Sequence, residues 1–557
     1  MLPRFDVGSL LPLGITALIV YLTIVPICMM LIQSVHLADG SFSLSHYKAI
    51  LTSGTAWGLI RNSAVFALGS TIVGTVVGTI LAWLVERTNM PGRRMMFGAA
   101  LVPLIMPGSL ATFSWVLLLS PSVGVINVVL QKLFGFESGP LVVTNMPGMI
   151  FVEGIHLSTL SFLLIAGALR SMDASLEEAS ASSGAGFIET ARRITLPLLA
   201  PAITSTLLIG FVRAVEGFEV PAMLGLPGRV YVLASQIYLA LKTFPIDYGV
   251  AGTYSTLLFV VGAVGVLIYL RLIAKGGFET VTGKSFRPRP IDLGRARWPA
   301  FLFCLGYVFT LFVLPALIML WASFLPYYSA PSFGALGRVS LDNYAEVLQN
   351  STIVSATRNS FVLAISSATL VVFLAAVSAW VTVRTKIRGR QLIDVMAFLP
   401  IAIPGLVLGV AMVRLYASMP IPIYGTILVM IITLVVKFLP YGMRQATSTV
   451  TQISPQLEEA SSVSGASWTE TFFRVLLPLL RPGLFAAWIY IFIVSTRELS
   501  STIILAGPRN TPLAVMIYDL YTNGNYTLLS ALGVLMVVAL TVLVMIFQRL
   551  GGKPVRH

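Results

Sequence analysis

The residues of this chain that could do chemistry are few, and many of them lie in two polar segments of nearly the same sequence. The first polar segment spans residues 173–201 and the second spans 454–482, with identical residues at 16 of 29 aligned positions and no gap. Each contains Leu-Glu-Glu-Ala-Ser, then Gly-Ala, Glu-Thr, an arginine and Leu-Pro-Leu-Leu. Carboxylates suit the first turns of a helix, and small side chains leave a surface on which another protein can pack. We interpret the two segments as docking sites for a two-fold partner.

The expected local structure of the polar segments is a pair of short helices. Asp173 and Ser454 occupy equivalent positions and are good N-caps for the first short helix. Gly184 and Gly465 allow a sharp bend after it. A second short helix is then expected to end at the Leu-Pro pair, where the proline returns the chain to the membrane. Ordinary cytoplasmic loops with buried, stabilising glutamates remain the alternative interpretation.

Ionisable side chains inside apolar segments form a second group of candidates, because charges within a membrane span are costly and commonly functional or paired. Two corresponding span ends carry them, and we interpret the five residues as lining a translocation path: Arg213, Glu216 and Glu219, with Arg497 and Glu498. Pairing of Arg213 with Glu216, three residues apart on one helix face, is the structural alternative. Further candidates are Arg414, Lys437, Glu153 and His156.

Enzymatic chemistry is not expected. The four histidines and two cysteines show no metal-ligand spacing, so we expect no metal site, cofactor or disulfide. One stretch, Gly277 to Ser285, resembles a phosphate-binding loop, but five residues separate its glycines where four are required, and no strand precedes it. Any ATP hydrolysis is therefore expected in separate subunits.

The composition indicates an integral membrane protein. Of 557 residues, 57% are hydrophobic and only 10% are charged, with a mean hydropathy of +0.90. Apolar stretches long enough to cross a bilayer predict twelve spans. They are centred near residues 22, 73, 107, 159, 208, 262, 312, 371, 405, 433, 491 and 537. The net charge of +14 lies mainly in alternate loops, which predicts cytoplasmic termini and no nucleic-acid partner.

The chain is expected to consist of two halves with one ancestor. Beyond the polar segments, the matches include Arg61-Asn62-Ser63 with Arg358-Asn359-Ser360, Arg87-Thr88 with Arg384-Thr385, and Pro103, Pro107 and Gly108 with Pro400, Pro404 and Gly405. Their offset is 297 residues against 281 in the polar segments, so the first half has 16 extra residues, placed around 121–145 with a short amphipathic piece at Val125–Phe134. Because each half has an even number of spans, six, both halves have the same orientation in the membrane, and the repeats are therefore parallel.

The predicted fold class is an all-α membrane protein of two parallel six-helix repeats. The predicted parts are a first span with an external segment (1–57), a first transmembrane domain (58–270), a basic cytoplasmic linker (271–298), a seventh span with an external segment (299–354), a second transmembrane domain (355–547) and a cytoplasmic tail (548–557).

The polar segments resemble the E-A-A-x-x-x-G-(x)9-I-x-L-P loop of type I ABC importer permeases. The matching residues are Glu178, Ala179, Gly184, Ile194, Leu196 and Pro197 in the first half, and Glu459, Ala460, Gly465, Leu477 and Pro478 in the second. Val475 replaces the isoleucine, and Ser180 and Ser461 replace the second alanine. The resemblance implies a bacterial inner-membrane permease that couples through these loops to two copies of an ABC ATPase subunit and receives cargo from a periplasmic substrate-binding protein.

The fused twelve-span form looks most similar to the ferric-iron uptake permeases, through the stretch Phe218 to Gly225 and Arg497-Glu498-Leu499. Glu219 and Glu498 at the path would favour a cation, whereas Arg213 and Arg497 could neutralise them or suit an anion. Thiamine, aminoethylphosphonate and polyamine therefore remain alternative cargoes. An ion-coupled secondary transporter is the alternative from another class, and it would not need the duplicated loops.

Overall fold

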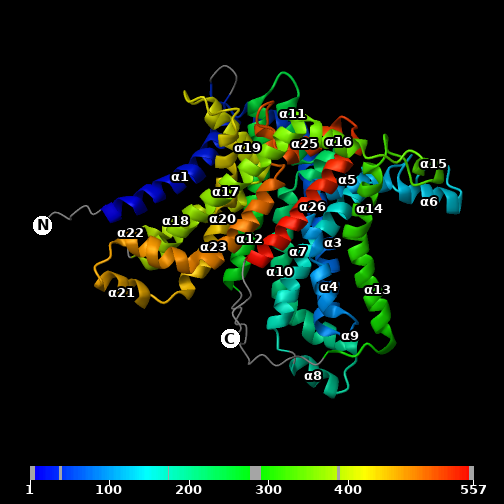
Figure 1. The fold of residues 1–557 in the computed structure, drawn as a ribbon, viewed down its shortest axis with the longest axis horizontal. Coiled ribbons are helices and arrows are strands. Elements are labelled where there is room, and N and C mark those ends of the chain that lie inside the picture. Colours follow the sequence, from blue (N-terminus) through cyan, green and yellow to red (C-terminus); the bar gives the residue numbers. More distant parts are fainter. Residues whose placement is uncertain (1–6, 37–40, 174, 276–289, 386–388, 551–557) are drawn as a thin grey trace.

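The computed structural model describes residues 7–36, 41–173, 175–275, 290–385 and 389–550, and these residues are almost entirely helical (Figure 1). Ten helices are long and apolar enough to cross a membrane. In the first half they are α1 (Val7–Ser34), α3 (Thr55–Arg87), α7 (Met146–Ser171), α10 (Leu196–Glu216) and α12 (Tyr248–Lys275). In the second half they are α13 with η5 and α14 (Arg297–Val308, Phe309–Val313, Leu314–Ser323), α17 (Ser351–Arg384), α20 (Ile427–Gln452), α23 (Leu477–Thr496) and α26 (Tyr526–Leu550). Helices satisfy their own backbone hydrogen bonds, as a bilayer requires.

The spans expected near residues 107 and 405 are not straight. In the first half, α4 (Arg93–Ala99) and η1 (Val102–Ile105) meet α5 (Gly108–Leu119) at 93°. In the second half, α18 (Arg390–Phe398) and η6 (Leu399–Ala402) meet α19 (Gly405–Ala417) at 108°. Proline precedes the glycine in both copies, and its missing N–H cannot continue the preceding helix. The twelve predicted spans are therefore found only if each bent pair is counted as one span.

The two halves repeat each other closely in space as well as in sequence. The helices α7 and α20 have the same length, 26 residues, and their first and last residues differ in number by 281. In each half this helix packs along the long second span, α7 on α3 and α20 on α17. The parallel duplication thus extends to the ends of individual helices.

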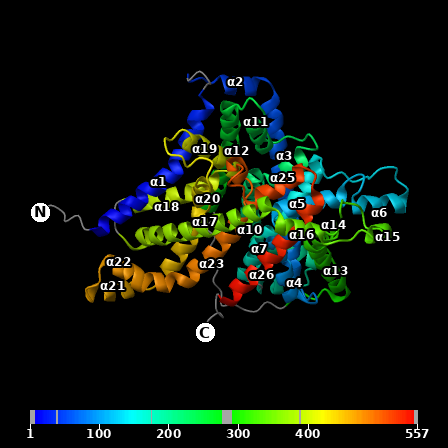
Figure 2. The same ribbon diagram turned by 45° about the horizontal axis from the view of Figure 1, so that its top comes forward.

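The first span of each half packs against the other half. The helix α1 contacts α18 and α19 of the second half, and α14 contacts α5 of the first half. Figure 2 shows α1 at the flank where α18 lies and α13 beside α4. Each half is therefore held by a span that its partner contributes.

Repeated polar residues fix the short helices that follow the fifth and eleventh spans. Ser63 accepts a hydrogen bond from the backbone N–H of Leu233 at 2.9 Å, where α11 (Leu233–Lys242) begins. Ser360 accepts the same bond from Leu513 at 2.6 Å, where α25 (Leu513–Thr522) begins. The duplicated Arg-Asn-Ser sequence is thus explained by a duplicated structural contact.

The remaining short elements lie mostly in the connections between spans. They are α2 (Ser45–Thr52), α6 (Val125–Phe134), η3 (Pro221–Gly225), η4 (Gly294–Ala296), α15 (Phe333–Leu336), α16 (Asp342–Gln349) and α24 (Thr502–Leu505). The helix α6 confirms the amphipathic piece predicted for the extra residues of the first half, and it projects sideways with α15 in both ribbon views (Figures 1 and 2). The sequence resembling a phosphate-binding loop, within 277–285, lies outside the described residues.

Candidate functional site

Each polar segment forms the predicted pair of short helices. The first contains α8 (Ser175–Ser182) and α9 (Phe187–Thr190), and the second contains α21 (Gln456–Val463) and α22 (Trp468–Thr471). Gly184 and Gly465 adopt φ angles of +82° and +83°, so both bends use the left-handed conformation that glycine permits. In Figure 1 the helices α8 and α9 lie at the lower end of the first half, and α21 and α22 lie at the outer end of the second.

The residues predicted to meet a partner are largely accessible. In the first polar segment Glu178, Ala179, Gly184, Leu196 and Pro197 are exposed and Ile194 is partly buried. In the second polar segment Glu459, Ala460 and Gly465 are exposed, and Leu477 and Pro478 are partly buried. The two copies thus present similar surfaces from different halves of one chain.

The expectation that the second short helix ends at the Leu-Pro pair was wrong. Five-residue π turns, η2 (Ala191–Thr195) and η7 (Phe472–Leu476), join the short helices directly to the long spans α10 and α23. Each π turn ends two residues before a proline, Pro197 or Pro478. The wider turn accommodates a residue that lacks an N–H donor and whose ring would clash with the preceding turn of an α-helix. A movement of either docking helix can therefore pass directly into a membrane span.

An ion pair that the sequence interpretation missed anchors each polar segment. Arg87 Nε lies 3.1 Å from Glu177 Oε2, and both side chains are buried. Arg384 Nε lies 2.9 Å from Glu458 Oε1 in the second half. Both arginines are at the C-terminal ends of long spans, α3 and α17, and both glutamates directly precede the exposed ones. The sign of these ion pairs that the sequence offered was the occurrence of Arg87 and Arg384 at equivalent positions of the two halves.

Further polar contacts complete the two anchors. Thr195 donates to Glu177 at 2.5 Å, and Trp380 donates to Glu458 at 2.8 Å. The two short helices of each segment are joined by a hydroxyl pair, Ser180 with Thr190 at 2.8 Å and Ser461 with Thr471 at 2.9 Å. These contacts hold the docking surface rigid, so much of the duplicated sequence maintains its shape.

Two exposed carboxylates outside the spans are hydrogen-bonded at helix starts. The backbone N–H of Ser175 donates to Asp173 at 2.9 Å, and this bond lowers the pKa of Asp173. The backbone N–H of Ser467 donates to Glu470, also at 2.9 Å, and lowers its pKa, while Ser467 caps the helix in return. Asp173 therefore supports the start of α8 through this bond, whereas in the second polar segment the N-cap of α21 is Pro455 and not the predicted Ser454.

The predicted path residues meet in one charged cluster between the halves. Lys437 Nζ lies 2.9 Å from Glu216 Oε1 and 2.8 Å from Glu498 Oε1. Arg213 Nη1 lies 3.4 Å from the other oxygen of Glu216, so the pairing offered as the structural alternative is present. Arg497 Nη1 donates to the carbonyl of Leu104 in the first half at 2.7 Å. Lys437 was only a secondary candidate in the sequence, yet it lies at the centre.

The broken spans direct their helix starts at this cluster. A Cβ on Gly108, the first residue of α5, would come within 1.9 Å of Glu219 Oε2. A Cβ on Gly405, the first residue of α19, would come within 2.4 Å of Lys437 Nζ and 3.1 Å of Glu498 Oε1. Helix N-termini favour carboxylates, and only glycine allows so close an approach. The duplicated Pro-Gly pairs thus place α5 and α19 against Glu219 and Glu498.

The other intramembrane candidates differ in their placement. Glu153 Oε1 would lie 3.6 Å from a Cβ on Gly217, so it borders the cluster. His156 occupies the position in α7 that corresponds to Lys437 in α20, and its Nε2 has no hydrogen-bond partner. Arg414 is exposed near the end of α19.

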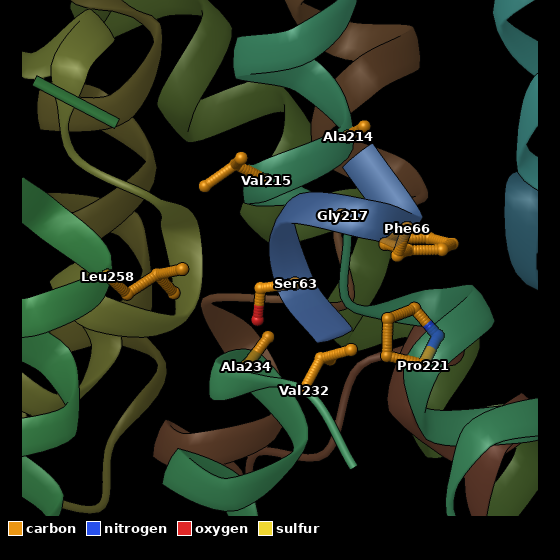
Figure 3. Close-up of a pocket in the computed structure, with 9 residues that line it drawn as sticks. All are labelled: Ser63, Phe66, Ala214, Val215, Gly217, Pro221, Val232, Ala234 and Leu258. Atoms are coloured by element: carbon orange, nitrogen blue, oxygen red, sulfur yellow. The ribbon is translucent and has the colours of Figure 1, made fainter. Parts of the chain in front are cut away.

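A small pocket, with room for little more than a water molecule, lies beside the cluster in the first half (Figure 3). Its lining residues are Ser63, Phe66, Ala214, Val215, Gly217, Pro221, Val232, Ala234 and Leu258. The one hydroxyl among these side chains, that of Ser63, already accepts the Leu233 bond, so the cavity has little to offer a polar solute. Among the residues that the structure describes, no group of three or more histidine, cysteine or acidic side chains could hold a metal ion.

Comparisons with known proteins match the same two halves. The profile of the family described as "Binding-protein-dependent transport system inner membrane component" matches residues 74–276 and again 371–557. The ferric transport system permease protein FbpB of Actinobacillus pleuropneumoniae is 27% identical over 557 residues, covering 99% of this chain and 79% of that protein. Putative ferric transport system permease protein FbpB 1 of Haemophilus influenzae is 28% identical over 510 residues, covering 90% and 78%. Sulfate transport system permease protein CysT of Escherichia coli is 25% identical over 239 residues, covering 40% and 86%.

Proposed function

The chain belongs to the family of binding-protein-dependent transport system inner membrane components, and from this premise we propose that it is the permease subunit of an ATP-driven importer for ferric iron. The observation that carries the importer role is that the family profile matches the chain twice, once in each half. Each match contains one intact polar segment. The permease forms the translocation path, and partner subunits bind and hydrolyse ATP. We place it in the bacterial inner membrane with both termini in the cytoplasm.

The polar segments are the coupling sites for two ATPase subunits. Their exposed carboxylates and small residues present a surface to a partner, and the buried ion pairs behind them resist deformation. Because α9 and α22 continue through π turns into α10 and α23, force applied at the docking helices reaches the charged cluster at the far ends of these spans. This continuity supports the coupling role.

Ferric iron is favoured by the relatives that cover almost the whole chain, whose names specify ferric transport. Shorter or partial matches are named for sulfate and for spermidine and putrescine, so another small solute is the second candidate. The path carries three carboxylates and three cations, so its net charge does not favour a cation. Glu216 and Glu498 are paired with Lys437, whereas no salt bridge is found for Glu219 among the described residues, so Glu219 is the carboxylate available to a passing cation.

The coupling role is tested with Glu178→Ala combined with Glu459→Ala in proteoliposomes containing the ATPase and the binding protein. We expect transport to fall to about a tenth or less with the fold intact, since ATPase and permease no longer engage. Asp342→Ala with Glu346→Ala, exposed on α16, is the matched control and should transport normally. Wild-type transport by the Glu178/Glu459 variant would refute the coupling role, and uptake by the purified permease alone would indicate a secondary transporter.

The cargo is tested with Glu219→Gln combined with Glu498→Gln. Ferric-iron uptake should fall, while stimulation of the ATPase by the loaded binding protein should persist. Unchanged uptake would show that these carboxylates do not line the path. Transport of only an anionic or neutral solute by the wild-type assembly would remove iron as the cargo.

A further inference from the structure

The bond between Lys437 and Glu216 joins the two halves of the molecule. Glu216 ends α10 of the first half, and Lys437 lies within α20 of the second. Among the described residues, theirs is the one ion pair that connects the two transmembrane domains, since the other salt bridges lie within a single half. Any movement that separates the end of α10 from the middle of α20 must break it.

Four of the six charged residues of the cluster form an alternating chain. Arg213, Glu216, Lys437 and Glu498 follow one another at 3.4, 2.9 and 2.8 Å, two positive and two negative. The side chain of Lys437 is only 9% exposed, whereas that of Arg213 is 50% exposed. A buried ammonium within a span requires compensating carboxylates, and two carboxylates held close together equally require the ammonium. Each half contributes one cation and one carboxylate to this chain, and the contact between the halves gives Lys437 a second carboxylate and Glu216 a second cation.

The two partners of Lys437 are not equivalent. Glu498 belongs to the same half, and one of its oxygens also accepts hydrogen bonds from the backbone N–H and the hydroxyl of Ser501 at 3.1 and 3.2 Å. The start of α19 at Gly405 lies against the same oxygen. Lys437 can therefore stay with Glu498 when the halves part, and the bond to Glu216 is the one that breaks.

The other half has no counterpart of this lysine. By the 281-residue offset the corresponding residue is His156, which takes part in no ion pair within the described part of the chain. Among the described residues, the pseudo-two-fold arrangement thus contains one cation that forms an ion pair across the halves, Lys437, and His156 at the corresponding position serves as a matched control.

We propose that Lys437 is a latch that keeps the translocation path closed between the outer ends of α10 and α23. Its ammonium joins Glu216 to Glu498 across the halves, and opening releases Glu216 while Lys437 remains with Glu498. The assignment of this end of α10 and α23 to the outer side of the membrane rests on the proposed importer function. The closure itself is a property of the permease alone.

The test measures passive leakage through the permease without ATPase, ATP or binding protein. Liposomes containing the purified chain and trapped dipicolinate are exposed to Tb³⁺, a hard trivalent cation whose entry produces luminescence. In Lys437→Met, Glu498 loses its cation and Glu216 keeps only the half-exposed Arg213, so no cation stands between the two carboxylates and they repel. We expect Tb³⁺ entry to rise about tenfold or more over wild type, because breaking a buried pair is strongly destabilising.

Three variants separate the latch from a general structural effect. Lys437→Arg keeps the charge and should remain tight, and His156→Met makes the same replacement at the corresponding position and should also remain tight. Lys437→Met with Glu216→Gln removes the repulsion and should reduce the leak toward wild type. Because a second substitution can also restore stability, the melting temperature of each purified variant is measured beside its leak, and leakage is compared only at temperatures at which all variants are folded.

The outcomes are distinct from those of the importer assay. A Lys437→Met protein as tight as wild type would overturn the latch, as would an equal leak in His156→Met or a double variant that leaks like the single one. Failure of ATP-driven uptake by the wild-type assembly would refute the proposed function while leaving the leakage comparison unaffected.

Discussion

Neighbouring glutamates in each polar segment have opposite surroundings. Glu178 and Glu459 are exposed, whereas Glu177 and Glu458 face inward and pair with arginines at the ends of α3 and α17. The exposed residue of each pair faces the surface, and the inner one determines where the helix lies. Substitutions at adjacent positions should therefore separate coupling from stability.

Glu177→Ala should destabilise the protein more than Glu458→Ala. The Arg87–Glu177 side chains are 3% and 7% exposed against 14% and 16% for Arg384–Glu458, so the first change leaves a charge without compensation in a drier site. We expect a loss of about 3–5 kcal/mol for Glu177→Ala, and less for Glu458→Ala. Thermal unfolding in detergent measures both. Arg87→Met with Glu177→Met should recover much of the loss, and an equal effect of the two single substitutions would contradict the burial argument.

At the level of single residues, the sequence identified the exposed residues of the polar segments but not the ion pairs that hold these segments in place. Glu178 is recognisable because its motif is local, with every element within about 20 residues. The Arg87–Glu177 pair spans 90 residues, and only its duplication as Arg384 and Glu458 hinted at it. Lys437 was noticed as a charge within a span, but its partners lie on two other helices, and a single sequence does not reveal which helices meet.

The bends between the short helices depend on backbone conformation alone. Gly184 and Gly465 have positive φ, and a Cβ at either position would meet no atom within 4 Å. The cost of a substitution is therefore conformational, about 1–2 kcal/mol for an ordinary L-residue in the left-handed region.

Gly465→Val should lower both stability and the transport obtained per ATP hydrolysed, because valine is β-branched and strongly disfavours positive φ. Gly465→Asn should be milder, since asparagine tolerates this conformation. The melting temperature and the ratio of uptake to ATP hydrolysis in the reconstituted assembly provide the two measurements. Similar losses for both variants would show that side-chain bulk at the partner surface, rather than the bend, is responsible.

The second polar segment should also respond to acid. Hydrogen bonds from Ser467 lower the pKa of Glu470 in the folded state, so its stabilisation is present above the unfolded pKa of about 4.3 and disappears as the pH falls through the folded value. Trp468, in the same short helix, stacks on Trp380 with ring centroids 4.0 Å apart. The near-ultraviolet circular dichroism of this pair should weaken below about pH 4.3. In Glu470→Gln the signal should lose this dependence, whereas Glu189→Gln in the first segment should retain it.

Element prediction succeeded where a pattern was continuous and failed where the chain turned within the membrane. Apolar length identified the long helices, and amphipathic spacing located α6 with its observed bounds. The matched Pro-Gly pairs were noticed but interpreted as parts of straight spans. Each bend depends on the side chains that lie at the start of the second helix, which are Glu219 for the 93° bend and the Lys437–Glu498 pair for the 108° bend. Glu219 and Glu498 lie more than 90 positions further along the chain than these helix starts, and Lys437 lies 32 positions further.

At the scale of the whole molecule, duplication within one chain allows the two halves to differ. The polar segments are alike, as expected if each meets an equivalent partner, while the cluster between the halves has a lysine on one side and a histidine on the other. Fusion preserves such an asymmetry, since a dimer of identical chains would carry the same residue twice. The family match to both halves was predictable from the repeat; the crossing of α1 and α14 onto the opposite halves was not, since contacts between helices of similar composition leave no local pattern.

The final prediction concerns the orientation of this duplicated molecule in the bilayer. Arginine and lysine gather in the loops on the side of the polar segments, so those loops should face the cytoplasm, and the extra residues that form α6 should face outward. Reporter fusions at Gly139, after α6, and at Ser285, in the basic linker, should report opposite sides of the membrane. Gly139 and Ser285 both follow the bent pair of α4–η1 with α5, so three spans separate them whether that pair crosses the membrane or forms a re-entrant loop. A further fusion at Asn89, before the bent pair, distinguishes these cases: it should report the cytoplasm with Ser285 if the pair crosses, and the outside with Gly139 if it does not.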